Sequence, residues 1–504
     1  MNAPTKTDAP PALDRRLLSI ASVVVLGSFM SILDTTIVNV AIRELSHSFG
    51  TSLSVTQWIS TGYMLALATV IPLTGWAADR FGTKRLYIGS IALFVIGSAL
   101  CGLAWSATSL IVFRVLQGFG GGMIMPAGMT ILSHAAGRER MGRVMGLVGI
   151  PMLVAPIVGP ILGGWFVDDL SWRWIFFVNL PIGVIALFAA SRFLDRDEPK
   201  PHHALDWRGL LMLSPGLAIF VYGLAETAAG GGFTRPDAVG GVLLGLALVI
   251  GFIWHARRKE GALIDVRLFG TRVVGAAAST SFFFGTAFFG TALLLPLYFQ
   301  LVRSESALHA GLLMAAQGIG AMISMPIAAR LTDKTGPGRI VLVGLGLTGL
   351  GLLGLTQIQS DTPMWMVEGM LFLLGLGMGS TMMPSMTAAL SSLQRHEIAR
   401  VTSGMNVVQR VGGSVGTALL AVVLSHQIAS VMPSTGVQES GLAVARAMTP
   451  AMHTAILPAL GRAFGHTFVW ALGVVVLGLV AAAFLPRKRA VHNAEQATAA
   501  ALVD

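Results

Sequence analysis

Residues 75–105 read GWAADRFGTKRLYIGSIALFVIGSALCGLAW. The first part of this stretch carries four charges, on Asp79, Arg80, Lys84 and Arg85, and the twenty residues that follow carry none. An α-helix of about 20 apolar residues is long enough to cross the hydrocarbon core of a bilayer. The stretch therefore predicts a charged loop followed by a membrane-spanning helix.

The same unit recurs along the whole chain with a regular alternation of charge. Of the 34 Lys and Arg residues, 26 fall in every second gap between long apolar runs, 6 fall in the intervening gaps and 2 lie inside runs. Cytoplasmic loops of membrane proteins carry an excess of Lys and Arg. Eight basic gaps alternating with seven poor gaps predict fourteen spanning helices, with both termini in the cytoplasm.

The composition excludes several other classes of protein. The chain is 54% hydrophobic and 12% charged, whereas soluble domains are roughly 25% charged. The net charge of +10 does not indicate nucleic acid, because the basic residues lie at the ends of the runs with no single basic face. Anionic head groups of the lipid bilayer are the expected partners.

Neither the N-terminal segment nor the cysteine content suggests processing or a metal site. Residues Met1–Arg16 are polar, and the run after them lacks a small-residue cleavage site, so we expect a retained span and no signal peptide. The lone Cys101 lies in an apolar run. It supports neither a disulfide framework nor a cysteine metal site.

An internal repeat divides the chain into two halves. Five residues recur 254 positions later: Pro72, Asp79, Arg80, Gly82 and Arg85 match Pro326, Asp333, Lys334, Gly336 and Arg339. Repeated halves are typical of transporters that rock one half against the other around a site near the membrane midplane. The repeat leaves two central helices unmatched, so we predict an all-α polytopic membrane protein of six, two and six helices.

These patterns also predict the organisation of the chain. The expected segments are a cytoplasmic tail at 1–16, a six-helix bundle at 17–193, a two-helix insert at 207–256, a six-helix bundle at 272–486 with a long outer loop at 429–465, and a cytoplasmic tail at 487–504. The outer loop could cap the outer mouth or contact a partner.

The charged loop quoted above is a candidate gating loop on the cytoplasmic side. Gly82 permits a tight turn, and Asp79 can pair with a guanidinium group or a helix N-terminus. Such a cluster can hold two halves together in one state and release them in another. The alternative is a set of ordinary cytoplasmic charges, and the repeat favours the gating role. Its candidate residues are Gly75, Asp79, Arg80, Gly82, Lys84 and Arg85.

Two opposite charges inside predicted spans lie at comparable depth. Counted at 1.5 Å per residue, Arg114 lies roughly 9 Å and Asp34 roughly 12 Å below the same outer edge. An arginine inside a span costs about 2.5–3.5 kcal/mol and normally finds a partner. Burial favours a neutral carboxyl group and a guanidinium favours a charged one, so movement of Asp34 relative to Arg114 could load and release a proton. A static ion pair is the alternative.

The span predicted at 143–167 is rich in proline and glycine. Prolines kink helices, and glycines let a neighbouring helix approach closely. We expect a hinge or a seal here. Its candidate residues are Pro156, Gly159, Pro160, Gly163 and Gly164.

In their order, these motifs resemble those of the drug:proton antiporter family of the major facilitator superfamily, the branch with fourteen spans. The matching segments are Leu33–Ala41, Gly75–Arg85, Arg114–Gly122, Gly149–Gly164, Trp172–Gly183 and Asp206–Gly209. Departures from the usual motifs are Ala77 and Thr83 in the loop, Ala155 in the antiporter motif, and Ile42-Arg43 where Leu-Pro is usual.

The resemblance implies a major facilitator fold and export of drugs or other amphipathic or cationic compounds across the bacterial inner membrane. The proton motive force would supply the energy and no cofactor would be needed. The expected partners are then a small-molecule substrate, protons and the bilayer, with a periplasmic adaptor as an unproven further partner. No nucleic acid is expected.

A broad substrate cavity is compatible with the side chains in the predicted spans. Methionine and aromatic surfaces adapt to varied apolar ligands, although packing in the core or against lipid is the more common role of such residues in spans. The candidate cavity residues are Asn39, Gln117, Met123, Phe284 and Met382. Arg410 and Glu368 are further charges in spans, and Glu368 could lie at the interface.

Other classes of function find less support. The sequence has no paired catalytic carboxylates and no His cluster at metal spacing, so we expect no catalytic or metal site. Gly118–Gly122 lies in an apolar run and not after a strand, so it is not a nucleotide fingerprint. The repeat and the kinked spans favour alternating access over a channel. A symporter or a dedicated exporter of one metabolite stays open.

Overall fold

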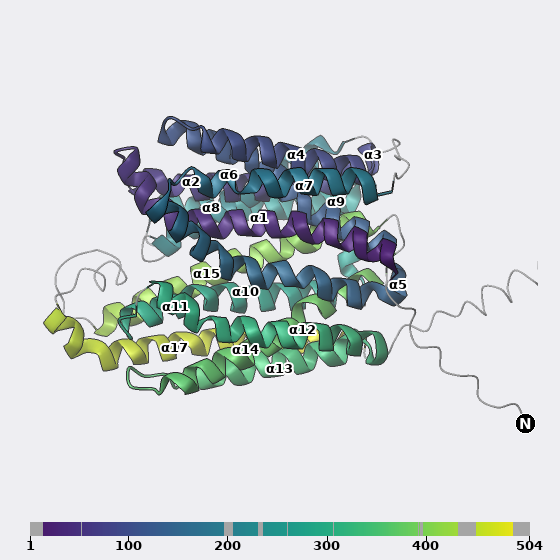
Figure 1. The fold of residues 1–504 in the computed structure, drawn as a ribbon. Coiled ribbons are helices and arrows are strands. Elements are labelled where there is room, and N and C mark those ends of the chain that lie inside the picture. Colours follow the sequence, from purple (N-terminus) through teal and green to yellow (C-terminus); the bar gives the residue numbers. More distant parts are fainter. Residues whose placement is uncertain are drawn as a thin grey trace, which may run out of the picture.

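The structure is a computed structural model that describes residues 14–51, 53–195, 205–229, 235–259, 261–305, 307–391, 393, 397–431 and 450–486. Within these ranges all regular structure is helical. Figure 1 shows the helices lying side by side in one bundle, with the N-terminal half and the C-terminal half in separate layers. The prediction of an all-helical membrane fold is confirmed.

The helices follow the predicted order. The N-terminal half holds α1 (Arg15–Ser48), α2 (Leu53–Val70), α3 (Leu73–Phe81), α4 (Thr83–Gly102), α5 (Ala107–Asp169), α6 (Trp174–Phe177) and α7 (Asn179–Phe193). The central pair is α8 (Trp207–Ala229) and α9 (Pro236–Arg258). After the 3₁₀ turn Leu268–Gly270, the C-terminal half holds α10 (Arg272–Leu301), α11 (Ala307–Leu313), α12 (Ala315–Thr335), α13 (Pro337–Leu355), α14 (Met364–Ser391), α15 (Ile398–Val431) and α17 (Pro450–Ala482).

Most of these helices are long and apolar enough to cross a membrane. Within the described ranges twelve meet this requirement, and α2 with α3 forms a thirteenth unit that bends by 57°. The predicted total of fourteen is compatible with these helices and stays a prediction, as does the cytoplasmic location of the termini. The start of α1 and the end of α17 lie at the same end of the bundle (Figure 1).

The long helix α5 passes α1 twice and therefore accounts for two predicted spans. On the first pass Arg114 contacts Asp34, and Gly128 lies against Val24. On the second pass the carbonyl oxygen of Ala155 accepts a hydrogen bond from the hydroxyl of Thr36. Because the contacts on α1 move from Asp34 to Val24 and back again, the chain must reverse between the two passes.

Two glycines mark equivalent turns in the repeated halves. Gly82 has a φ of 83° between α3 and α4, and Gly336 has a φ of 90° between α12 and α13. Residues with a Cβ rarely adopt this conformation, so glycine is the residue that such a sharp turn requires. The predicted loop after the second span thus contracts to one residue, with Asp79 and Arg80 on the last turn of α3.

The central helices α8 and α9 are held together at one end by Asp206. Its side chain is 1% exposed, and its Oδ1 accepts hydrogen bonds from Lys259 Nζ at 2.7 Å and from the N–H of Gly209 at 3.1 Å. His255 Nε2 lies 3.0 Å from the same oxygen. Burial by itself raises the pKa of Asp206, but the hydrogen bonds from Lys259 and His255 outweigh it, so the pKa lies below its ordinary value.

Helices extend into both ends of the predicted outer loop. Helix α15 continues to Val431 and α17 begins at Pro450, so helices occupy much of the predicted range 429–465. Residues 432–449, and the two predicted tails at 1–13 and 487–504, lie outside the described residues. The expectation that this loop caps the outer mouth or contacts a partner therefore stays a prediction.

Candidate functional site

A buried ion pair lies at the centre of the N-terminal half. Arg114 Nη1 on α5 is 2.6 Å from Asp34 Oδ2 on α1, and the two side chains are 1% and 0% exposed. The structure thus joins the two charges that the depth count placed at a similar level. Charge-assisted hydrogen bonds of this length are among the stronger interactions in proteins.

Two amide side chains complete the surroundings of the carboxylate. Gln117 Nε2 donates to Asp34 Oδ1 at 2.9 Å, and Asn179 Nδ2 at the start of α7 donates to the same oxygen at 3.1 Å. Asn179 also contacts Ser98 Oγ on α4 at 3.1 Å. Helices α1, α5 and α7 therefore meet at one carboxylate, and its three N–H donors match the ionised form.

Aromatic side chains and a backbone carbonyl hold the guanidinium group. The guanidinium carbon of Arg114 lies 3.9 Å from the ring centroid of Tyr63 on α2 and 5.8 Å from that of Phe176. Arg114 Nε donates to the carbonyl oxygen of Ile59 at 3.3 Å, and Nη1 donates to Gln117 Oε1 at 2.8 Å. Cation–π contacts strengthen when they are desolvated. The two rings, the carbonyl oxygen of Ile59 and the Gln117 amide therefore hold this arginine in place.

Small residues let the helices approach closely enough to build this cluster. A Cβ on Gly97 of α4 would lie 2.6 Å from Gln117 Cα, and a Cβ on Gly118 would lie 2.8 Å from the carbonyl oxygen of Tyr63. Contacts this short leave no room for a methyl group. The glycines of the Arg114–Gly122 segment thus serve helix packing, as expected for membrane helices.

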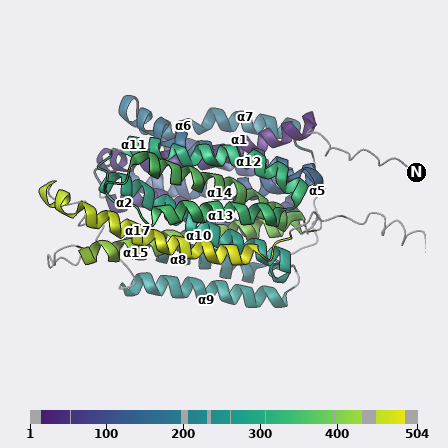
Figure 2. The same ribbon diagram turned by 90° about the horizontal axis from the view of Figure 1, so that it is seen from below.

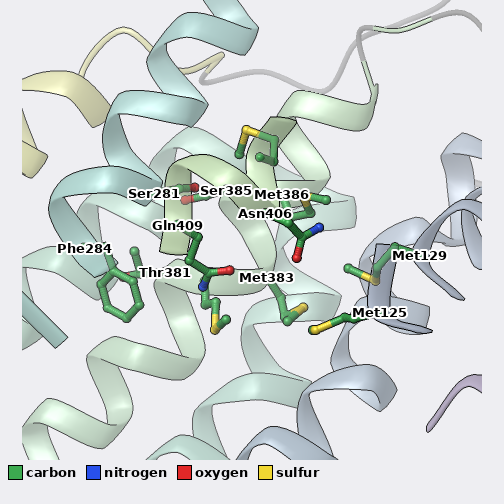
Figure 3. Close-up of a pocket in the computed structure, with 12 residues that line it drawn as sticks. Met125, Met129, Ser281, Phe284, Thr381, Met383, Ser385, Met386, Asn406 and Gln409 are labelled. Atoms are coloured by element: carbon green, nitrogen blue, oxygen red, sulfur yellow. The ribbon is translucent and has the colours of Figure 1, made fainter. Parts of the chain in front are cut away.

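A small cavity lies between the two halves (Figure 3). Met125 and Met129 of α5 face residues of three C-terminal helices across it. These residues are Ser281 and Phe284 of α10, Thr381, Met382, Met383, Ser385 and Met386 of α14, and Met405, Asn406 and Gln409 of α15. Its volume is about 40 Å³, far below the roughly 300–1,000 Å³ of drug-sized sites. The halves must separate before a drug-sized molecule can enter.

The predicted cavity residues fall into three groups. Phe284 and Met382 line the cavity. Gln117 does not line this cavity, because its side chain is fully buried in the ion-pair cluster. Met123 also does not line this cavity and packs against the hydrophobic core. The side chain of Asn39 lies outside the described residues.

The predicted gating loop contacts the other half of the protein. Asp79 Oδ2 on α3 lies 3.5 Å from Arg400 Nη2 on α15, and the two side chains are 21% and 17% exposed. Lys84 Nζ donates to the carbonyl oxygens of Ser191 and Leu194, which belong to its own half. Gly75 is buried in α3, and Arg80 and Arg85 are exposed. The corresponding side chain of Asp333 lies outside the described residues.

The glycine- and proline-rich segment packs against α1. A Cβ on Gly159 would lie 2.9 Å from Thr36 Cβ, so the two helices are in close contact there. Gly163 is buried, and Gly164 has open space where a Cβ would be. The side chains of Pro156 and Pro160 lie outside the described residues, and the backbone is helical through both positions.

The two further charges in spans occupy different environments. Arg410 on α15 is exposed and lies one turn after Asn406, which lines the cavity. Glu368 lies in the second turn of α14 and is partly exposed. It belongs to none of the helices that build the ion-pair cluster.

Sequence reasoning missed three residues of these contacts. Tyr63, Asn179 and Arg400 lie on helices distant in sequence from their partners, so no local spacing points to them. Asn179 does stand in one of the motifs that carried the family resemblance, which was a usable signal. Among the described residues no group of three His, Cys, Asp or Glu side chains is placed to hold a metal ion.

The chain is similar in sequence to bacterial multidrug transporters. The chain is 44% identical over 500 residues to the multidrug resistance protein B homolog of Mycobacterium tuberculosis, covering 96% of this chain and 93% of that protein. It is 31% identical over 413 residues to the multidrug export protein EmrB of Haemophilus influenzae, covering 81% of each.

Solved structures share the fold at low sequence identity. The human organic anion transporter MFSD10 matches with a TM-score of 0.60 at 15% identity, over 91% of this chain and 99% of that one. The proton:xylose symporter XylE matches with a TM-score of 0.59 at 16% identity, over 94% and 96%.

The sequence pattern of the Major Facilitator Superfamily matches residues 24–417. Together with the bacterial relatives, this match makes the chain a multi-pass transporter of the bacterial inner membrane and not an enzyme. The chain belongs to the Major Facilitator Superfamily.

Proposed function

We propose that this transporter exports drugs or other amphipathic small molecules, cationic ones among them, in exchange for protons. The names of its relatives, a multidrug resistance protein and a multidrug export protein, support the substrate class. The observation that carries proton exchange is the fully buried Asp34 with its three N–H donors.

Protonation of Asp34 would disturb this cluster. The ionised carboxylate accepts hydrogen bonds from Arg114, Gln117 and Asn179, whereas a protonated carboxyl group has a donor of its own that needs an acceptor. Asn179 Oδ1 is buried and accepts no hydrogen bond within the described residues. Rotation of this amide would offer Oδ1 to the new O–H, so one proton changes the contacts among α1, α5 and α7.

The same helix links this cluster to the cavity. Helix α5 carries Arg114, and it also carries Met125 and Met129, which line the cavity between the halves. A shift of α5 that follows the protonation of Asp34 would therefore also change the space available to a substrate. Alternating access needs such a link between the two sites, because each ligand shifts the equilibrium only through its differential contacts with the two states.

Inside-out vesicles test the proposal. Ethidium, an amphipathic cation, is added to vesicles that contain the protein, and proton release is followed with a pH-sensitive dye. Asp34→Asn should still bind ethidium but should release no protons. Glu368→Gln removes another carboxylate from a predicted span and should behave like the unaltered chain. Normal proton release from Asp34→Asn would refute the role of this carboxylate.

A further inference from the structure

A hollow of about 590 Å³ lies where the start of α10 meets the end of α17. It is lined by Arg272, Val273, Ala483, Phe484, Leu485 and Pro486. Except for the arginine, these side chains are apolar. The hollow lies at the end of the bundle where α1 begins, which is the end that the charge pattern places in the cytoplasm.

The apolar wall of the hollow continues a stripe that runs along α17. Phe484 is 54% exposed, and exposed apolar residues precede it at helical spacing: Val469, Val476, Leu477 and Val480, each 50–58% exposed. Figure 2 shows α17 across the front of the bundle, with nothing of the C-terminal half in front of it. In a membrane protein such a stripe contacts the acyl chains of lipids, and it leads directly to the hollow.

The polar part of the hollow is positively charged. The side chain of Arg272 is exposed, and its guanidinium carbon lies 6.0 Å from the ring centroid of Phe484. Arg339, also exposed, follows Gly338, whose N–H donates to the carbonyl oxygen of Pro486 at 3.0 Å. None of the residues that line the hollow is acidic, and in the described part of the chain Arg272 forms no ion pair with a carboxylate.

We propose that this hollow binds an anionic phospholipid of the cytoplasmic leaflet. The phosphate pairs with the planar guanidinium of Arg272, which suits bidentate recognition of phosphate, and Arg339 adds a second positive charge. One acyl chain lies on Phe484 and follows the exposed stripe of α17. Basic pockets between spanning helices at the cytoplasmic surface bind lipid head groups of this kind.

Native mass spectrometry of the purified full-length protein tests the site. The protein is released from micelles that contain palmitoyl-oleoyl-phosphatidylglycerol or the matching phosphatidylcholine, and the retained lipid is counted. The unaltered chain should retain the anionic lipid, and Arg272→Gln should lower its apparent affinity about fivefold. Arg272→Lys should keep part of the affinity because it keeps the charge but not the planar fork.

A matched control separates this site from general surface charge. Arg462 is exposed near the other end of α17, so Arg462→Gln should not change the retention of phosphatidylglycerol. Equal losses in the two variants would mean unspecific attraction and would overturn the proposal. Displacement of the lipid by millimolar glycerol 1-phosphate would identify a free phosphate as the ligand instead. Equal retention of the two lipids by the unaltered chain would also refute the proposal, and that result needs no variant to fold.

Discussion

The ion pair between Asp34 and Arg114 should be strongly coupled in its effect on stability. The perturbation is a double-mutant cycle made of Asp34→Asn, Arg114→Met and the two together. Arg114→Met leaves the buried carboxylate without its guanidinium partner, and Asp34→Asn leaves the buried guanidinium without its carboxylate. The double variant contains neither charge.

The burial of the pair sets the expected magnitude. The two side chains are 0% and 1% exposed, and removal of one partner of a buried pair typically costs about 3–5 kcal/mol because the other charge is left uncompensated. Such a loss lowers the unfolding midpoint by about 10 °C for a half of this size. Since the double variant buries no charge, its loss should be smaller than the sum of the single losses by about 2 kcal/mol or more.

The single cysteine of the protein allows the unfolding midpoint to be measured. Cys101 is the single cysteine of the chain, it is 0% exposed, and its thiol donates to Gln117 Oε1 in the cluster at 3.6 Å. A thiol-reactive fluorescent dye therefore reports the temperature at which this region opens. Cys101→Ala should give no signal and serves as the blank.

Additive losses in the cycle would contradict this reasoning. They would mean that the two charges are solvated or partnered independently of each other. The exposed pair of Arg16 and Asp195, at 72% and 63%, provides the comparison: Arg16→Met should leave the midpoint unchanged, because exposed ion pairs contribute little.

Three further predictions concern other parts of the fold. Asp79→Asn removes the contact with Arg400 between the halves and should shift the population toward states open on that side by about fivefold at most; an unchanged distance distribution between spin labels across the two halves would argue against a gating role. The pKa of Asp206 lies below its usual 3.8. Its ionised carboxylate therefore contributes its whole stabilisation at pH values above 3.8, and this contribution is lost as the pH falls through the lowered pKa. The unfolding midpoint temperature of the unaltered chain should therefore fall more between pH 5 and pH 3 than that of Asp206→Asn. Equal falls in the two proteins would show that Asp206 does not cause this pH dependence. A Cβ on Gly416 would lie 1.9 Å from a carbonyl oxygen of α10, so Gly416→Ala should destabilise by about 1–3 kcal/mol, whereas Gly346→Ala, with open space around it, should be tolerated in the same dye assay.

Much of the fold could be predicted because the bilayer constrains the position of each segment along the membrane normal. Apolar length and the alternation of basic residues predicted a helical membrane protein with a repeated half, and the repeat reappears as the matching turns at Gly82 and Gly336. Depth follows from the same count, since each helical residue rises 1.5 Å. That count brought Asp34 and Arg114 to a similar level before any contact was known.

The neighbours of each side chain could not be obtained in this way. Gln117 has the same depth whether it faces a substrate cavity or the ion pair, and only the packing of α5 against α1 decides that it binds Asp34. The partners Tyr63, Asn179 and Arg400 come from helices far apart in sequence. Rotation about each helix axis and the choice of neighbouring helix depend on close packing among many side chains. The sequence by itself thus determined how deep each residue lies, and only the tertiary structure decided what it touches.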